Sequence, residues 1–164
     1  MTKVHTVAVP MADLAQVIAL QLDNGGRATI TVTGVSMLPM LRNRKDSVTL
    51  IPAGKQGQGD VIFYRRENGQ YVLHRIIRET SEGYLCSGDN QYELEPVKPA
   101  QVIAVVDSFV RKGKTYDGSH RGYQLYTAAW VKLFFLRRPY IALRRRIGRL
   151  LWRLKAGRKR ENKV

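Results

Sequence analysis

Two residues carry the side-chain types that hydrolytic chemistry needs. Ser36 lies in a loop bounded by Gly34 and Pro39, and His74 lies in a later stretch of strand-forming residues. A serine hydroxyl becomes a good nucleophile only when a nearby base takes its proton. An unperturbed histidine has a pKa of about 6.5, so it can act as that base at neutral pH. The pair predicts nucleophilic attack by Ser36 with His74 as the general base.

Four short stretches occur in a fixed order along the chain. They are GVSMLP at 34–39, GDV at 59–61, YVLHRI at 71–76 and GDN at 88–90. Each alone is ordinary loop, strand or turn chemistry. Together, over about residues 27 to 107, they resemble the type I signal peptidase family, whose wider clan includes the self-cleaving LexA-like repressors. More closely still, the chain resembles small bacterial proteins of the S24/S26 peptidase type.

The resemblance implies a role for each matching residue. Ser36 matches the nucleophile, and His74 stands where most bacterial members have Lys, as in the archaeal and endoplasmic-reticulum signal peptidases. A histidine base also needs an orienting acceptor, usually a carboxylate. Asp89 is the first candidate because it matches the family's turn, while Glu93 and Glu95 are the alternatives. The competing interpretation is that Asp89 only shapes the turn.

The nucleophile loop also supplies the expected oxyanion and substrate-binding residues, namely Gly34, Ser36, Met37 and Pro39. Some family members have a serine two residues before the nucleophile, whose side chain donates a hydrogen bond to the oxyanion. This chain has Gly34 there, so the donor must come from the backbone. The N–H of Ser36 is the natural candidate.

Residue patterning predicts a mainly β domain between helical ends. Helical spacing and a Gly25-Gly26 stop predict a helix at 10–24. Period-two alternation and turn signals predict strands at 28–33, 47–51, 60–66, 70–78, 84–87 and 101–110, with Asn68-Gly69 as a hairpin turn. Helices are expected at 123–137 and 140–155, broken by Pro139. The resemblance implies the coiled β fold of signal peptidases and LexA. The expected units are a helix at 1–26, a catalytic domain at 27–118 and a basic helical extension at 119–164.

The charge of the chain is concentrated in its last part. The net charge is +15, and residues 131–164 hold 13 Lys or Arg against Glu161 alone. Leu143, Ile147, Leu150, Leu151 and Leu154 share one helical face with Arg residues opposite. This pattern is typical of a helix on an anionic membrane surface, which we expect through residues 126–160. Packing of the apolar face on the β domain and binding to nucleic acid are the alternatives.

Other features limit the function further. With one Cys and three His, we expect no disulfide, no metal site and no cofactor. No signal peptide and no apolar run of about 20 residues is visible. These features favour a cytoplasmic location or a peripheral one on the cytoplasmic face of the membrane.

The leading hypothesis is a serine endopeptidase that cleaves precursor or signal-like peptides through an acyl-enzyme on Ser36. The first alternative is a catalytically inactive module of the same fold that binds peptides or partner proteins by strand addition. The second is a LexA-like self-cleaving regulator. It is disfavoured because residues 1–26 are too short for a usual DNA-binding domain.

Overall fold

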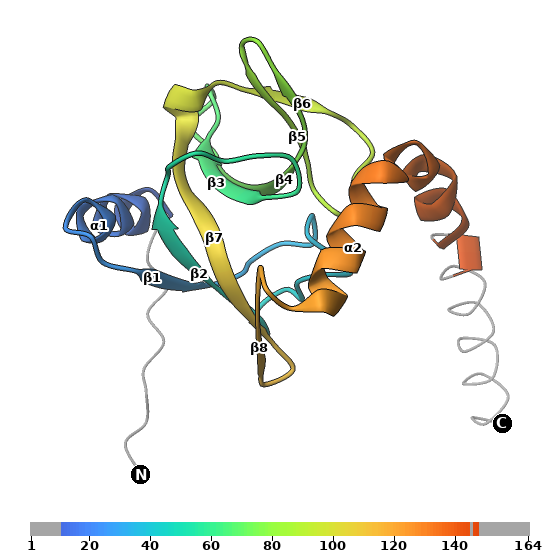
Figure 1. The fold of residues 1–164 in the computed structure, drawn as a ribbon, viewed down its shortest axis with the longest axis horizontal. Coiled ribbons are helices and arrows are strands. Elements are labelled where there is room, and N and C mark those ends of the chain that lie inside the picture. Colours follow the sequence, from blue (N-terminus) through green and yellow to red (C-terminus); the bar gives the residue numbers. More distant parts are fainter. Residues whose placement is uncertain (1–10, 145, 148–164) are drawn as a thin grey trace, which may run out of the picture.

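A computed structural model describes residues 11–144, 146 and 147, and it shows an antiparallel β body flanked by helices (Figure 1). Helix α1 (Met11–Asp23) comes first, and α2 (Arg121–Lys132) follows the strands. The strands are β1 (Ala28–Thr31), β2 (Ser47–Pro52), β3 (Val61–Arg65), β4 (Tyr71–Thr80), β5 (Gly83–Ser87), β6 (Glu95–Val97), β7 (Val102–Arg111) and β8 (Lys114–Asp117). The predicted mainly β fold with helical ends is confirmed.

Strand β7 joins the two halves of the sheet. The strand order is β1-β2-β7-β3-β4-β5-β6, and β8 pairs with β7 as a hairpin partner. All pairings are antiparallel, and the register shifts in β2 against β7, in β3 against β7 and in β4 against β5. Such bulges bend a strand and increase its twist. The sheet therefore coils around a core instead of lying flat (Figure 1).

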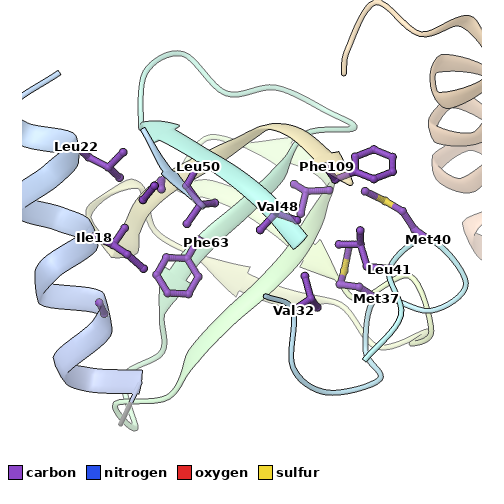
Figure 2. Close-up of a cluster of buried hydrophobic side chains, with 14 residues drawn as sticks. Ile18, Leu22, Val32, Met37, Met40, Leu41, Val48, Leu50, Phe63 and Phe109 are labelled. Atoms are coloured by element: carbon purple, nitrogen blue, oxygen red, sulfur yellow. The ribbon is translucent and has the colours of Figure 1, made fainter. Parts of the chain in front are cut away.

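The larger hydrophobic core extends from α1 to the loop after β1 (Figure 2). Ile18 and Leu22 enter it from α1, where they lie on the inner face of the helix. At the other end Met37 and Leu41 enter it from the loop that carries Ser36. Burial of these side chains is the main force holding both segments on the sheet.

The Asn68-Gly69 hairpin forms where the sequence predicts it. It connects β3 to β4, and the N–H of Arg66 donates to the carbonyl of Gln70 at 2.8 Å. Gly69 has a φ of 84°, whereas Asn68 is not among the residues with positive φ. The turn therefore needs one left-handed residue, and glycine adopts that conformation without the strain a side chain would add.

Two short strands were not predicted. Strand β6 contains Pro96, which lacks the N–H that a ladder needs, and it lies at the edge of the sheet where this loss is tolerated. Strand β8 follows a tight turn in which Lys112 and Gly113 both have positive φ. A lysine gives no sequence signal for such a turn.

The C-terminal helices break earlier than predicted. A 3-10 turn, η2 (Phe134–Leu136), follows α2, and regular helix resumes at Arg137. Pro139 lies in the first turn of that helix, where its missing N–H leaves no bond unmade. Leu150, Leu151 and Leu154 lie outside the described residues. Within the described part of the chain, no helix combines the length and the apolar character needed to cross a bilayer.

Replacing Ile18 with Ala tests how strongly α1 is held on the sheet. Ile18 is buried in the core, so we expect a loss of about 2–5 kcal/mol in the free energy of unfolding. Val17 on the same helix is largely exposed, and Val17→Ala should change stability by less than about 0.5 kcal/mol. Urea unfolding of the three proteins measures this difference. Equal stabilities would show that α1 contributes little to the core.

Candidate active site

The loop between β1 and β2 presents Ser36 from a firmly packed base. Met37 and Leu41 are buried in the core, and the N–H of Leu41 donates to the carbonyl of Met37 at 2.8 Å. Gly34 has a φ of 91°, and its N–H donates to Asn43 Oδ1 at 2.9 Å. Ser36 itself is partly exposed. The loop therefore fixes its backbone while leaving the serine accessible.

The turn at residues 88–90 packs against Ser36 and holds its backbone. The N–H of Asn90 donates to the carbonyl of Ser36 at 2.6 Å, and Asn90 Nδ2 donates to the carbonyl of Val35 at 3.2 Å. A Cβ on Gly88 would come within 3.0 Å of the Cβ of Ser36 and 2.7 Å of its carbonyl oxygen. Glycine is required at 88 because any side chain would push the serine loop away.

His74 lies on β4 beside the same turn. Arg75 pairs with Ser87 across the β4–β5 ladder, so the register continued by one residue sets Gly88 opposite His74. Ser36 lies against Gly88, so both predicted residues border the same turn. No hydrogen bond joins the Ser36 hydroxyl to the His74 ring in this structure.

The His74 ring is buried and held from one side. Its Nδ1 lies 3.1 Å from Tyr64 Oη and 3.8 Å from Glu95 Oε2. Burial lowers the pKa of His74 to about 4, although the Glu95 charge opposes that shift. The ring is therefore neutral at pH 7. A neutral ring that donates from Nδ1 to Tyr64 leaves Nε2 free to accept a proton.

Glu95 is the carboxylate that reaches the histidine. It forms a paired contact with Arg66, with Nε to Oε1 at 2.6 Å and Nη2 to Oε2 at 2.5 Å. Burial alone would raise the pKa of Glu95, but hydrogen bonds from Arg66 lower it below its usual range. The nearby Tyr64 hydroxyl also lowers the pKa of Glu95. Glu95 is thus charged, and its Oε2 lies 3.8 Å from His74 Nδ1.

Asp89 lies on the opposite side of β4. Successive residues of a strand point to opposite faces, so His74 and Arg75 face opposite ways. Both carboxylate oxygens of Asp89 accept from Arg75, Oδ1 from Nε and Oδ2 from Nη2, each at 2.9 Å. Both side chains of the pair are fully buried. These contacts give Asp89 a structural role in the turn, and its role toward His74 stays a prediction.

Side chains of α2 add further hydrogen bonds to the Arg75–Asp89 pair. Tyr126 Oη donates to Asp89 Oδ2 at 2.9 Å, and Trp130 Nε1 donates to the Asp89 carbonyl at 3.0 Å. Arg75 Nη1 donates to Thr127 Oγ1 at 3.1 Å and to the Gly59 carbonyl at 2.7 Å. Burial alone would lower the pKa of Arg75, but the Asp89 charge raises it above its ordinary value.

Arg137, which follows η2, completes the attachment of the helical extension to the turn. Arg137 Nη1 donates to the carbonyl of Gly88 at 3.1 Å, and Nη2 donates to the carbonyl of Trp130 at 3.0 Å. Its guanidinium also stacks over Phe134. Burial lowers the pKa of Arg137 to about 10, so the group remains charged at pH 7. No local sequence pattern predicts these contacts, because they join segments far apart in the chain.

A groove of about 480 Å³ runs along the beginning of β4. It is lined by Thr33 beyond β1, by Arg66 and by residues 69–72. Strand β5 pairs with β4 only from Arg75 onward, so in the described sheet the preceding residues have an unpaired edge on that side. Such an edge can pair with an extended peptide. The free edge continues along β4 to His74.

The family model described as Peptidase S24-like matches residues 11–107, which is more than half of the chain. The match includes Ser36, His74, Asp89 and Glu95, and it ends within β7. No curated protein matches the chain.

Replacing Asp89 with Ala tests how far the turn depends on the buried ion pair. The change leaves the Arg75 charge buried without its partner, and we expect a loss of about 3–5 kcal/mol in the free energy of unfolding. The matched control is Asp107→Ala, which removes the partner of the largely exposed Arg27. Exposed pairs contribute at most about 1 kcal/mol. Urea unfolding that gives the same value for both variants would contradict the structural role of Asp89.

Proposed function

We propose that this chain, which belongs to the Peptidase S24-like family, is a serine endopeptidase that works through an acyl-enzyme on Ser36. The observation that carries the proposal is the arrangement around Gly88. Ser36 rests on this residue, while the strand register sets His74 opposite it. The base is buried and neutral, which is the state a general base needs before it accepts a proton.

The proposed reaction begins when His74 Nε2 accepts the proton of the Ser36 hydroxyl. Ser36 Oγ then forms a bond to the scissile carbonyl carbon, and the peptide C–N bond breaks as the imidazolium returns the proton to the leaving amine. A water molecule attacks the acyl-enzyme with His74 again as base. This step releases the new carboxylate and restores the Ser36 hydroxyl.

Glu95 takes the orienting role in this proposal. Its carboxylate faces His74 Nδ1 at 3.8 Å, and Tyr64 Oη lies 3.1 Å from the same nitrogen. This arrangement favours the tautomer with the proton on Nδ1. Asp89 contributes by holding the turn under Ser36 through its pair with Arg75. The sequence offered Glu95 only as an alternative to Asp89.

The oxyanion donor in this proposal is the backbone N–H of Ser36. The N–H of Gly34 is already bonded to Asn43 Oδ1, so it is not available to a substrate. Met37 is buried in the core, and the carbonyl of Pro39 accepts a hydrogen bond from Arg111 Nη2, so both residues support the loop. A single backbone donor provides part of the stabilisation found in a complete oxyanion hole.

The substrate in this proposal is a peptide or protein precursor bound in extended form. Its backbone would pair with the free edge of β4 before Arg75, and the groove beside Thr33 would receive its side chains. The resemblance to signal peptidases implies small residues such as Ala near the cut. The same groove would serve an inactive peptide-binding module, which is favoured by the missing Ser36–His74 hydrogen bond.

Labelling with a fluorophosphonate, which phosphonylates activated serines with loss of fluoride, separates an enzyme from a binding module. We expect the full-length protein to be labelled and Ser36→Ala and His74→Ala to lose at least about 10³-fold in rate, because the two residues act as a unit. Ser81→Ala removes an exposed serine in a turn and should label normally. Absence of labelling in the wild type from pH 6 to 9 would favour the binding module.

The pH dependence of labelling tests the state of His74. Below its pKa the ring is protonated and cannot accept the serine proton, so the rate should fall as pH drops, with a midpoint at about 4. An unshifted histidine would give a midpoint at about 6.5. His74 has a pKa of about 6.5 in the unfolded chain and about 4 in the folded protein, so the unfolded chain binds the proton more tightly. The free energy of unfolding therefore decreases as pH falls from about 6.5 to about 4. Circular dichroism at each pH separates loss of fold from loss of base.

Glu95→Gln tests the orienting role. The change removes the charge that raises the pKa of His74, so the midpoint should move to lower pH. The plateau rate should also fall about 10- to 100-fold, a part of what a positioned general base contributes. The control is Glu93→Gln, which alters an exposed carboxylate two residues away. An unchanged profile in Glu95→Gln would leave His74 oriented by another group.

A further inference from the structure

The helical segment after α2 exposes a set of large apolar side chains. We define the 133–147 face as Leu133, Phe135, Leu136, Tyr140, Leu143 and Ile147. Phe135 is 71% exposed and Leu143 is 58% exposed. The segment stands on the side of the molecule opposite α1, away from the coiled sheet (Figure 1). Clustered apolar exposure of this kind marks an interaction surface.

The inner side of this segment already has its partners. Arg137 and Ile141, one helical turn apart, are both buried, and Arg137 bonds to the carbonyls of Gly88 and Trp130. Leu136, Tyr140, Leu143 and Ile147 repeat at intervals of three and four, so they form a separate stripe that is exposed. The helix therefore cannot bury this stripe on the β body without breaking the Arg137 contacts.

The charge around the face has one sign. Residues 118–160 contain 13 Lys or Arg and no Asp or Glu. Among the described residues, Lys132, Arg138, Arg144 and Arg146 are exposed beside the apolar stripe. A second copy of this chain would bring like charges together, so the charge disfavours a symmetric dimer through this face. The charge is complementary to an anionic surface.

We propose that the 133–147 face docks on the surface of an anionic lipid bilayer. The apolar stripe would enter the region between headgroups and acyl chains, and the basic side chains beside it would reach the lipid phosphates and carboxylates. Arg137 ties the docked segment to the Gly88 carbonyl under Ser36. Docking would therefore hold the candidate active site at a fixed height above the bilayer. The binding itself does not depend on peptidase activity.

Vesicle flotation of the full-length protein tests the proposal. We expect it to float with vesicles containing about one third phosphatidylglycerol and to stay at the bottom with neutral phosphatidylcholine vesicles. Raising salt from 50 to about 500 mM should weaken binding without abolishing it, because screening acts on the charges and not on the buried side chains. A protein that does not float with anionic vesicles at low salt overturns the proposal.

Paired variants separate the apolar and charged contributions. Phe135→Ser with Leu143→Ser should weaken binding to anionic vesicles at least tenfold, because both side chains lose their burial in lipid. The control is Val17→Ser with Leu20→Ser, two exposed apolar residues on α1, which should bind like the wild type. Arg138→Gln with Arg144→Gln should also weaken binding about tenfold, and Lys112→Gln with Lys114→Gln should not. Equal effects of the face and control variants would overturn the assignment of the face.

Two further measurements exclude the other occupants. Light scattering on the full-length protein without lipid should give a monomer, and a dimer that Phe135→Ser with Leu143→Ser dissociates would assign the face to a second copy. Binding to a short DNA duplex should be unaffected by the same apolar variant. The contrary outcome has two parts. Phe135→Ser with Leu143→Ser would bind vesicles as the wild type does, and Arg138→Gln with Arg144→Gln would lose DNA binding and vesicle binding together. The segment would then be a general polyanion binder, and the lipid proposal would fail.

Discussion

The buried ion pair between Arg75 and Asp89 is the interaction on which the rest of the site depends. Two charges removed from water are stable only with good geometry and full hydrogen bonding. The structure provides both, since Asp89 accepts two bonds from Arg75 and one from Tyr126, and Arg75 also donates to the Gly59 carbonyl. The pair joins β4, the turn before β3 and the turn after β5. Because Ser36 rests on that last turn, the position of the serine follows from the ion pair.

Side chains alternate along β4, so the two faces of the strand contact different groups. Arg75 faces the ion pair and α2, whereas His74 faces Tyr64 and Glu95. The strand can therefore hold the turn rigidly on one side and keep a neutral histidine on the other. Glu95 belongs to this second face because it pairs with Cys86, which in turn pairs with Ile76, two residues beyond His74. A shift of one residue in register would exchange the two faces.

The sequence could predict the local elements but not their long-range partners. Strand alternation, the Asn68-Gly69 turn and the helix stop at Gly25-Gly26 are local signals, and the corresponding elements form within a few residues of the expected bounds. The choice between Asp89 and Glu95 depends on the β4–β5–β6 register, which no local pattern encodes. Tyr126 and Trp130 lie far from Asp89 in the sequence, so the residue pattern of α2 alone could not predict their hydrogen bonds to it.

The helical extension has two connected roles in this arrangement. The family match ends at residue 107. Tyr126, Trp130 and Arg137, which lie beyond it, donate hydrogen bonds to the turn at residues 88–90 that packs against Ser36. The same extension carries the exposed 133–147 face. Arg137 lies between these regions, bonded to Gly88 on one side and surrounded by Trp130 and Phe134 on the other. A displacement of the helix after η2 must therefore strain the bond to Gly88 or break it. Whatever surface the face binds is mechanically coupled to the turn under the serine.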